Sequence, residues 1–125
     1  MTTSTRDRAL DAALVSFATR GYEATSLDDV AGEVGVSKQA VLYYFTSKPV
    51  LLDAVVDRSA TELSAALEDA LDRAGEGWDR VEAVVRSVFR LALRRPELLG
   101  LLREVSRLGP PAAPRLMAVL DPLVQ

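Results

Sequence analysis

The chain has 125 residues, of which 49% are hydrophobic, and a formal net charge of −3 at pH 7. This length suits one compact domain or a small domain joined to the beginning of a second, and the abundance of Leu, Ala and Val favours an all-α protein. Cysteine and histidine are both absent, which excludes disulfides, thiolate metal sites and the commonest general base. We therefore expect a protein that is not an enzyme and that holds no cofactor and no metal.

Two helices are predicted at the N-terminus from their start signals and apolar spacing. The first covers residues 5–20, with Ser4 as N-cap and Gly21 as the residue that stops it. The second covers residues 27–34 and is opened by Ser26 and Asp29, which have the spacing of a capping box. Apolar residues at steps of three and four predict the buried faces of both helices: Leu10, Leu14, Phe17 and Ala18 in the first, and Leu27, Val30, Ala31 and Val34 in the second.

A tight turn and a third helix follow directly. Gly35 can adopt a positive φ, Val36 returns to the core, and Ser37 caps a helix over residues 38–45. Helical periodicity turns Val41 and Phe45 inward. It places the remaining side chains outward, with Tyr44 at the edge: Ser37, Lys38, Gln39, Leu42, Tyr43 and Thr46.

Helix, glycine turn and helix, with small Ala31 at the crossing, are typical of a helix-turn-helix, in which the second helix enters the major groove of DNA. The outward residues suit that groove, because Gln pairs with adenine, Lys with guanine or phosphate, Leu with a thymine methyl, and Tyr with phosphates. Hydroxyl and ammonium donors flank the third helix at Thr25, Ser26 and Lys48. The alternative is that Leu42 and Tyr43 belong to a helix buried between two others.

The remainder of the chain predicts a helical core. A long helix over residues 48–73 begins after Ser47, with Pro49 in its first turn, and Gly75 and Gly77 form a linker. An amphipathic helix over 78–95, a helix over 97–108 that Pro96 can begin, and a rigid connection over 109–114 come next. A last helix is predicted over 115–124. The apolar face of the helix over 78–95 consists of Val81, Val84, Val85, Val88, Phe89 and Ala92.

The run from Arg8 to Val55 contains, in order, GYEATS, A-x-x-x-G-V-S and YYF-x-SK. This ordered series resembles the DNA-binding domain of the tetracycline-repressor (TetR) family of bacterial transcriptional regulators. The resemblance covers a little under half of the chain. It implies an all-α fold, with a helix-turn-helix DNA-binding domain over residues 1–48 and the start of a ligand-binding and dimerisation domain over 49–125, the two joined by the long fourth helix.

The resemblance also implies a function in the cytoplasm. A homodimer would bind double-stranded DNA at a roughly palindromic operator, and a small-molecule inducer of unknown identity would tilt the fourth helix and release the operator. The residues expected to contact DNA are Thr25, Ser26, Ser37, Lys38, Gln39, Leu42, Tyr43, Tyr44 and Lys48. Among them, Lys38, Gln39, Leu42 and Tyr43 are the candidates for base contacts.

This chain departs from the family pattern in three places. Leu42 replaces a tyrosine and Tyr44 a histidine, which puts one phosphate contact in doubt, and Pro49 stands where an acidic or small residue is usual. Family members are usually longer, so we expect that residues are missing after Gln125.

Two other functions compete with DNA binding. Leu42 and Tyr43 would also suit a helical protein-interaction module, and an enzyme would rest only on acidic pairs such as Asp28 and Asp29, which favourable charge at a helix N-terminus explains better. No apolar run is long enough to span a membrane. Several residues could line a ligand pocket, although an ordinary hydrophobic core is the preferred interpretation for each: Trp78, Phe89, Leu93, Leu101 and Met117.

Overall fold

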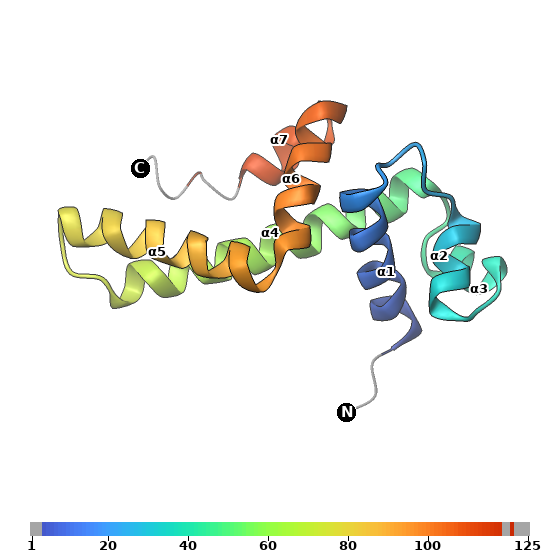
Figure 1. Ribbon diagram of the computed structural model, residues 1–125, viewed down its shortest axis with the longest axis horizontal. Coiled ribbons are helices and arrows are strands. Elements are labelled where there is room, and N and C mark those ends of the chain that lie inside the picture. Colours follow the sequence, from blue (N-terminus) through green and yellow to red (C-terminus); the bar gives the residue numbers. More distant parts are fainter. Residues whose placement is uncertain (1–3, 119–120, 122–125) are drawn as a thin grey trace.

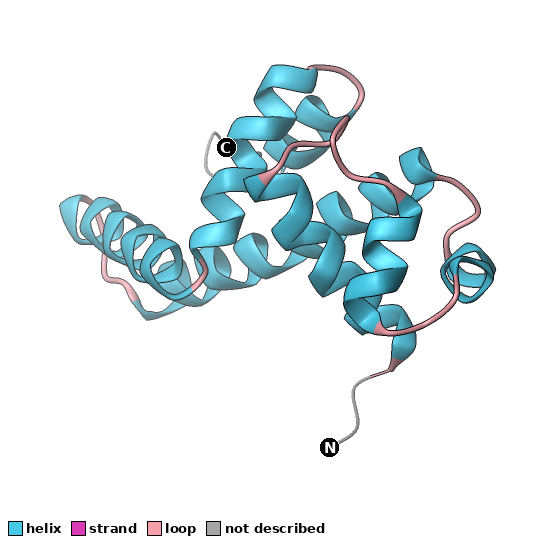
Figure 2. Ribbon diagram, turned by 45° about the vertical axis from the view of Figure 1, so that its right-hand side comes forward, coloured by secondary structure: helices cyan, strands magenta, loops and turns pink. Residues whose placement is uncertain are grey.

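The computed structural model describes residues 4–118 and 121. In that part of the chain the backbone forms seven α-helices and no strand (Figure 2), as the composition predicted. Figure 1 shows α1, α2 and α3 near one end of the long helix α4, with α5 folded back along the other end and α6 crossing between them. The helices are α1 (Thr5–Thr19), α2 (Leu27–Val34), α3 (Lys38–Tyr44), α4 (Lys48–Arg73), α5 (Trp78–Arg94), α6 (Pro96–Leu108) and α7 (Ala112–Met117).

Serine caps begin each of the first four helices, as predicted. Each serine hydroxyl accepts a hydrogen bond from the backbone N–H three residues later, at distances of 3.1, 3.0, 3.2 and 3.3 Å for Ser4, Ser26, Ser37 and Ser47. The capping box of α2 is complete, because the Asp29 carboxylate also accepts from the Ser26 backbone N–H at 2.9 Å. These local bonds set the boundaries of the N-terminal helices within one residue of the prediction.

The core of the N-terminal helical region forms where α1, α2, α3 and the start of α4 meet. Phe17 and Phe45 are its largest fully buried side chains. Burial of one such side chain contributes about 1.5–3 kcal/mol to stability. The core residues predicted on α1 are all buried, and α4 adds Leu51.

Helix α5 packs on α4 through a different face from the predicted one. Leu91 is its one buried residue in the described chain, and the Ser87 hydroxyl donates to the Ala66 carbonyl of α4 at 3.2 Å. Most of the predicted apolar stripe is exposed instead: Val81, Val85, Val88 and Phe89. The pattern correctly marked an apolar face, but the contact with α4 uses the face that carries Ser87 and Leu91. The stripe is therefore an exposed apolar surface of α5 in the described chain.

Helix α7 begins earlier than predicted. It starts at Ala112, inside the segment 109–114 that was expected to be a rigid connection, and it is described to Met117. Pro114 lies in its first turn, where a missing N–H costs no helical hydrogen bond. The rest of the helix predicted over 115–124 lies mostly outside the described residues.

Helix α6 joins the N-terminal domain to the helical core. Its residue Gly100 lies directly against Ala18 of α1: a Cβ built on Gly100 would be 2.9 Å from the Ala18 Cβ and 3.0 Å from the Ala18 carbonyl oxygen. One turn further on, the Glu104 carboxylate accepts a hydrogen bond from the backbone N–H of Tyr22, in the loop that follows α1. The position of α1 is thus linked to that of α6 as well as to α4.

Candidate nucleic-acid interface

The turn between α2 and α3 brings the two helices together as in a helix-turn-helix. Gly35 takes the left-handed conformation, with φ of 81° and ψ of 33°, and its N–H donates to the Ala31 carbonyl at 2.9 Å. The N–H of Val36 donates to the same carbonyl at 3.0 Å, and the Val36 side chain packs against the core. Ala31 is buried, as expected for the small residue at the crossing.

Helix α3 presents its polar and aromatic side chains outward, as its periodicity predicted. Val41 and Phe45 are buried, whereas Lys38 and Gln39 are exposed and Tyr43 is 81% exposed. Leu42 is half-buried. A helix buried between two others would cover Tyr43, so the structure excludes that alternative for the described chain.

The two tyrosines of α3 support each other on the surface. Their rings are 5.0 Å apart between centroids and almost perpendicular, an edge-to-face arrangement that is favourable for aromatic pairs. Tyr44 is less exposed than Tyr43 and also lies 6.4 Å from the Phe45 ring. Tyr44 thus anchors the end of α3, while the Tyr43 hydroxyl remains free to reach a ligand.

Polar groups surround α3 at its ends. Ser26 and Ser37 are exposed N-caps. The Lys48 ammonium lies 4.2 Å from the centre of the Tyr22 ring, a favourable cation–π contact that fixes the first turn of α4 against the loop after α1. Lys38 is 3.8 Å from the Asp28 carboxylate, an exposed pair that adds little stability and leaves the ammonium accessible.

Thr25 does not face solvent in the way that the sequence suggested. Its side chain is only 2% exposed; its hydroxyl donates to the Gly21 carbonyl at 2.9 Å and forms a hydrogen bond of 2.8 Å with the Ser16 hydroxyl. These bonds fix the loop between α1 and α2. A direct contact between Thr25 and DNA stays a prediction that this geometry does not favour.

Two arginines of α1 were not among the predicted contact residues. The Arg6 guanidinium lies 5.4 Å from the centre of the Phe45 ring at the end of α3, and Arg8 donates to the Val34 carbonyl at 2.6 Å. A basic residue in the first turn of a helix is unfavourable with respect to the helix dipole. The position of Arg6 in the first turn of α1 was therefore the feature of the sequence that could have marked it as a candidate contact residue. Arg8 has a local role, because it satisfies a carbonyl at the end of α2.

The acidic pair of α2 has a structural explanation. The bond from the Ser26 backbone N–H holds the pKa of Asp29 below its ordinary value, and Arg20, which lies 2.8 Å from the carboxylate, acts in the same direction. Asp28 is exposed beside Lys38. A carboxylate that is stabilised in its ionised form by a helix cap is poorly suited to acid–base chemistry near neutral pH.

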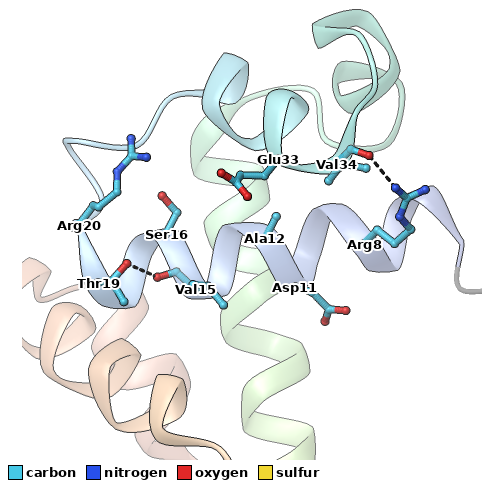
Figure 3. Close-up of a pocket in the computed structure, with 9 residues that line it drawn as sticks. All are labelled: Arg8, Asp11, Ala12, Val15, Ser16, Thr19, Arg20, Glu33 and Val34. Carbon is cyan, nitrogen blue, oxygen red and sulfur yellow. Dashed lines mark hydrogen bonds between the residues drawn. The ribbon is translucent and has the colours of Figure 1, made fainter.

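A depression of about 530 Å³ lies between α1 and α2. Figure 3 shows Arg8 and Arg20 at its two ends and Asp11 and Glu33 between them. It is open and carries both signs of charge, and none of its lining residues comes from α3. It therefore adds nothing to the surface presented by α3.

A second cavity, of about 260 Å³, lies among α4, α5, α6 and α7. Of the residues that suited either a pocket or a core, Leu101 and Met117 line it. Trp78, Phe89 and Leu93 do not line it, and they are 78%, 67% and 84% exposed. Leu98 and Leu102 of α6 also line this cavity, so the helix that touches α1 forms part of its wall.

Residues 4–118 and 121 contain no helix long and apolar enough to cross a membrane and no cluster of acidic side chains placed to hold a metal ion.

A family model described as bacterial regulatory proteins, tetR family, matches residues 9–55. The chain is 32% identical over 119 residues to the HTH-type transcriptional repressor DrrR1 of Streptomyces coeruleorubidus, a match that covers 94% of this chain and 43% of DrrR1. It is 34% identical over 84 residues to the HTH-type transcriptional activator FasR of Mycolicibacterium smegmatis, over 67% of this chain and 38% of FasR.

Among solved structures, the chain is similar to the TetR family transcriptional regulator PfmR from Thermus thermophilus. The TM-score is 0.78 at 29% identity, over 96% of this chain and 65% of PfmR. The chain thus spans less than half the length of the two curated relatives and about two thirds of PfmR. The match to residues 9–55 runs from α1 into α4 and includes the whole helix-turn-helix. The chain belongs to the tetR family of bacterial regulatory proteins.

Proposed function

We propose that this protein is a sequence-specific DNA-binding transcriptional regulator that places α3 in the major groove. The exposed face of α3 carries the proposal, because it combines Lys38 and Gln39 with a tyrosine, Tyr43, that is 81% exposed. Lys and Gln are suited to base edges and Tyr hydroxyls to phosphates. Tyr43 thus presents its ring and hydroxyl to solvent beside Lys38 and Gln39, where they can reach DNA.

The proposed contacts divide into two groups. Lys38, Gln39, Leu42 and Tyr43 would reach base edges, since they lie on the outward part of α3. Ser26, Ser37, Tyr44 and Lys48 would bind phosphates and set the orientation of the domain. Thr25 would act indirectly, by fixing the loop between α1 and α2.

A homodimer in the cytoplasm is part of the proposal. The exposed apolar residues of α5, above all Trp78, Phe89 and Leu93, support assembly, because a protein in water seldom leaves such an area uncovered. A two-fold dimer would read a roughly palindromic operator whose half-sites lie one or more helical turns apart.

The proposed response is repression that a small molecule relieves. Its support is the position of α6, which lines the apolar cavity with Leu98 and Leu101 and touches α1 through Gly100. A molecule in the cavity would contact the same helix that positions the N-terminal domain. DrrR1, which matches 94% of this chain, is described as a repressor, and this favours repression over activation.

The test is fluorescence anisotropy of the protein with DNA from upstream of its own gene, titrated at several salt concentrations beside a scrambled duplex. We expect tight binding to the first duplex, weaker binding to the second, and a steep fall in affinity with salt, since phosphate contacts release counterions. Binding that is insensitive to both DNA sequence and salt would contradict the proposal and favour a protein-interaction module.

Tyr43→Ala and Lys48→Ala are expected to weaken operator binding about 5–10-fold each, which is typical of the loss of a single contact. Lys48→Ala should also reduce the slope of log affinity against log salt by about 1, because one phosphate contact is lost. Arg94→Ala is the matched control: Arg94 is exposed and basic but lies in the last turn of α5, outside the helix-turn-helix. If all three variants bound equally well, α3 and the start of α4 would not be the DNA-binding surface.

A further inference from the structure

The cavity among α4, α5, α6 and α7 is lined almost entirely by hydrocarbon. Thirteen residues line its volume of about 260 Å³, and twelve of them are Leu, Val, Ala or Met. The exception is Ser59 of α4, a buried residue that offers one hydroxyl group. The described lining contains no charged side chain.

The cavity has a buried floor and an open edge. Leu91, Leu101 and Leu116 are buried, whereas Leu99 and Met117 are more exposed, at 61% and 49%. Flexible leucine and methionine side chains at an entrance can adapt to ligands of different shape. A molecule can therefore enter from the exposed side and end against apolar walls.

The ionic cluster at the junction of α5 and α6 offers no charge to a ligand. Arg95, at the junction of α5 and α6, is paired with Glu62 of α4 at 2.6 Å and with Glu97 of α6. Burial is the largest effect on Glu97 and opposes its ionisation, but the hydrogen bond from Arg95, a backbone hydrogen bond and the charge of Arg95 together outweigh it and hold the pKa of Glu97 below its ordinary value. Because each of these charges already has a partner, a charged group that entered the cavity would lose its hydration and gain no counter-charge.

We infer that the cavity binds an uncharged aliphatic or alicyclic group of about nine non-hydrogen atoms, at roughly 30 Å³ each. The cavity exceeds the apolar cavity of about 150 Å³ that is known to hold benzene in another protein, and it approaches the lower end of small-molecule sites, near roughly 300 Å³. The inference rests on the proposed ligand-responsive function and names the chemical class of the ligand. The group is either a whole neutral molecule or the apolar end of an amphiphile whose polar end stays at the edge.

Calorimetric titration of the purified protein with three molecules of equal chain length tests this class. The probes are 1-decanol, decanoate and 1,10-diaminodecane. We expect decanol to bind and the diamine to bind at least tenfold more weakly, because at least one of its two charges must enter the cavity. If decanoate binds as tightly as decanol, the site takes the apolar end of an amphiphile. If decanoate binds as weakly as the diamine, the site takes a whole neutral molecule. Equal binding of decanol and the diamine, or no binding of decanol, would overturn the inference.

A variant that fills the cavity tests the location. Ala92 of α5 lines the cavity, whereas Ala65 of α4 is exposed and does not. We expect Ala92→Leu to weaken decanol binding at least tenfold without lowering the melting temperature, and Ala65→Leu to bind decanol like the parent. Equal decanol binding by both variants would show that decanol does not bind in this cavity. If Ala92→Leu does not fold, the titration of the parent protein with the three probes still tests the ligand class.

The same proteins separate this inference from the proposed function. Operator binding is measured by anisotropy with and without decanol, and self-association by sedimentation. Decanol that binds without changing operator affinity would support the ligand class and contradict the proposed response. If decanol fails to bind but Ala92→Leu alters self-association, the cavity belongs to an interface with a second copy of the chain. That result would overturn the inference about the ligand, even if the protein still bound its operator.

Discussion

Replacing Gly100 by valine is expected to lower the free energy of unfolding by about 2–3 kcal/mol, as is typical of overpacking in a tight contact. A Cβ at this position would lie 2.9 Å from the Ala18 Cβ and 3.0 Å from the Ala18 carbonyl oxygen. Because the carbonyl belongs to the backbone of α1, a side chain at Gly100 can be accommodated only if the two helices separate. Chemical denaturation followed by circular dichroism measures the effect.

Gly32→Val is the matched control, since Gly32 is also a helical glycine. A Cβ on Gly32 would meet no atom within 4 Å, so the substitution changes only helix propensity and should alter stability by less than about 0.5 kcal/mol. The double variant Gly100→Val with Ala18→Gly should recover part of the loss, because one of the two close contacts disappears. If Gly100→Val and Gly32→Val were equally stable, α6 would not pack closely against α1.

The features that the sequence predicted well depend on short-range interactions. Ser26, Asp29 and Gly35 determine the ends of α2 through bonds between residues close in sequence, so their spacing alone is informative. The outward face of α3 follows from the same logic, because helical periodicity together with a buried Val41 and Phe45 places Tyr43 outside.

The features that the sequence did not predict depend on where separate helices meet. Thr25 is buried because Ser16, nine residues earlier, offers it a hydrogen bond, and nothing in the local pattern reveals that partner. The apolar stripe of α5 predicts a face that packs against another element but does not identify that element. The contact with α4 uses Leu91 instead. The sequence can therefore place an apolar residue on one face of its helix. Whether that residue lines a cavity, as Leu101 of α6 does, depends on how α4, α5 and α7 pack around it.

The contact between Glu104 and Tyr22 joins residues 82 positions apart, and we expect it to contribute strongly to stability. The side chain of Glu104 is buried, and its carboxylate accepts from the Tyr22 backbone N–H and from Arg107, at 2.7 Å for Oε1 and 3.1 Å for Oε2. Glu104→Ala is expected to lower the free energy of unfolding by about 2 kcal/mol, within the range for hydrogen bonds to a charged group. Glu23→Gln is the control, because Glu23 is an exposed partner of the same Arg107, and exposed pairs are worth at most about 1 kcal/mol.

The dependence of stability on pH identifies the role of the Glu104 charge. The hydrogen bond from Arg107 holds the pKa of Glu104 below its ordinary value of 4.5, against the effect of burial, and the Tyr22 N–H and the charge of Arg103 act in the same direction as Arg107. A lowered pKa in the folded state means that the ionised carboxylate contributes stability above about pH 4.5 and that this contribution is lost as the pH falls through the folded pKa. Arg107 remains protonated throughout, since its own pKa is raised by Glu104 and Glu23.

Glu104→Gln keeps the shape of the side chain but cannot ionise. We therefore expect the parent protein to be the more stable at pH 7 and to lose more stability than Glu104→Gln between about pH 6 and pH 3. Asp29 and Glu97 titrate in both proteins, so their effect cancels in the difference between the two denaturation series. A constant difference across this range would mean that the folded protein does not favour the ionised form of Glu104. A difference that closes on acidification would establish that the folded protein favours the ionised carboxylate of Glu104, which accepts hydrogen bonds from Arg107 of α6 and from the backbone of Tyr22 after α1.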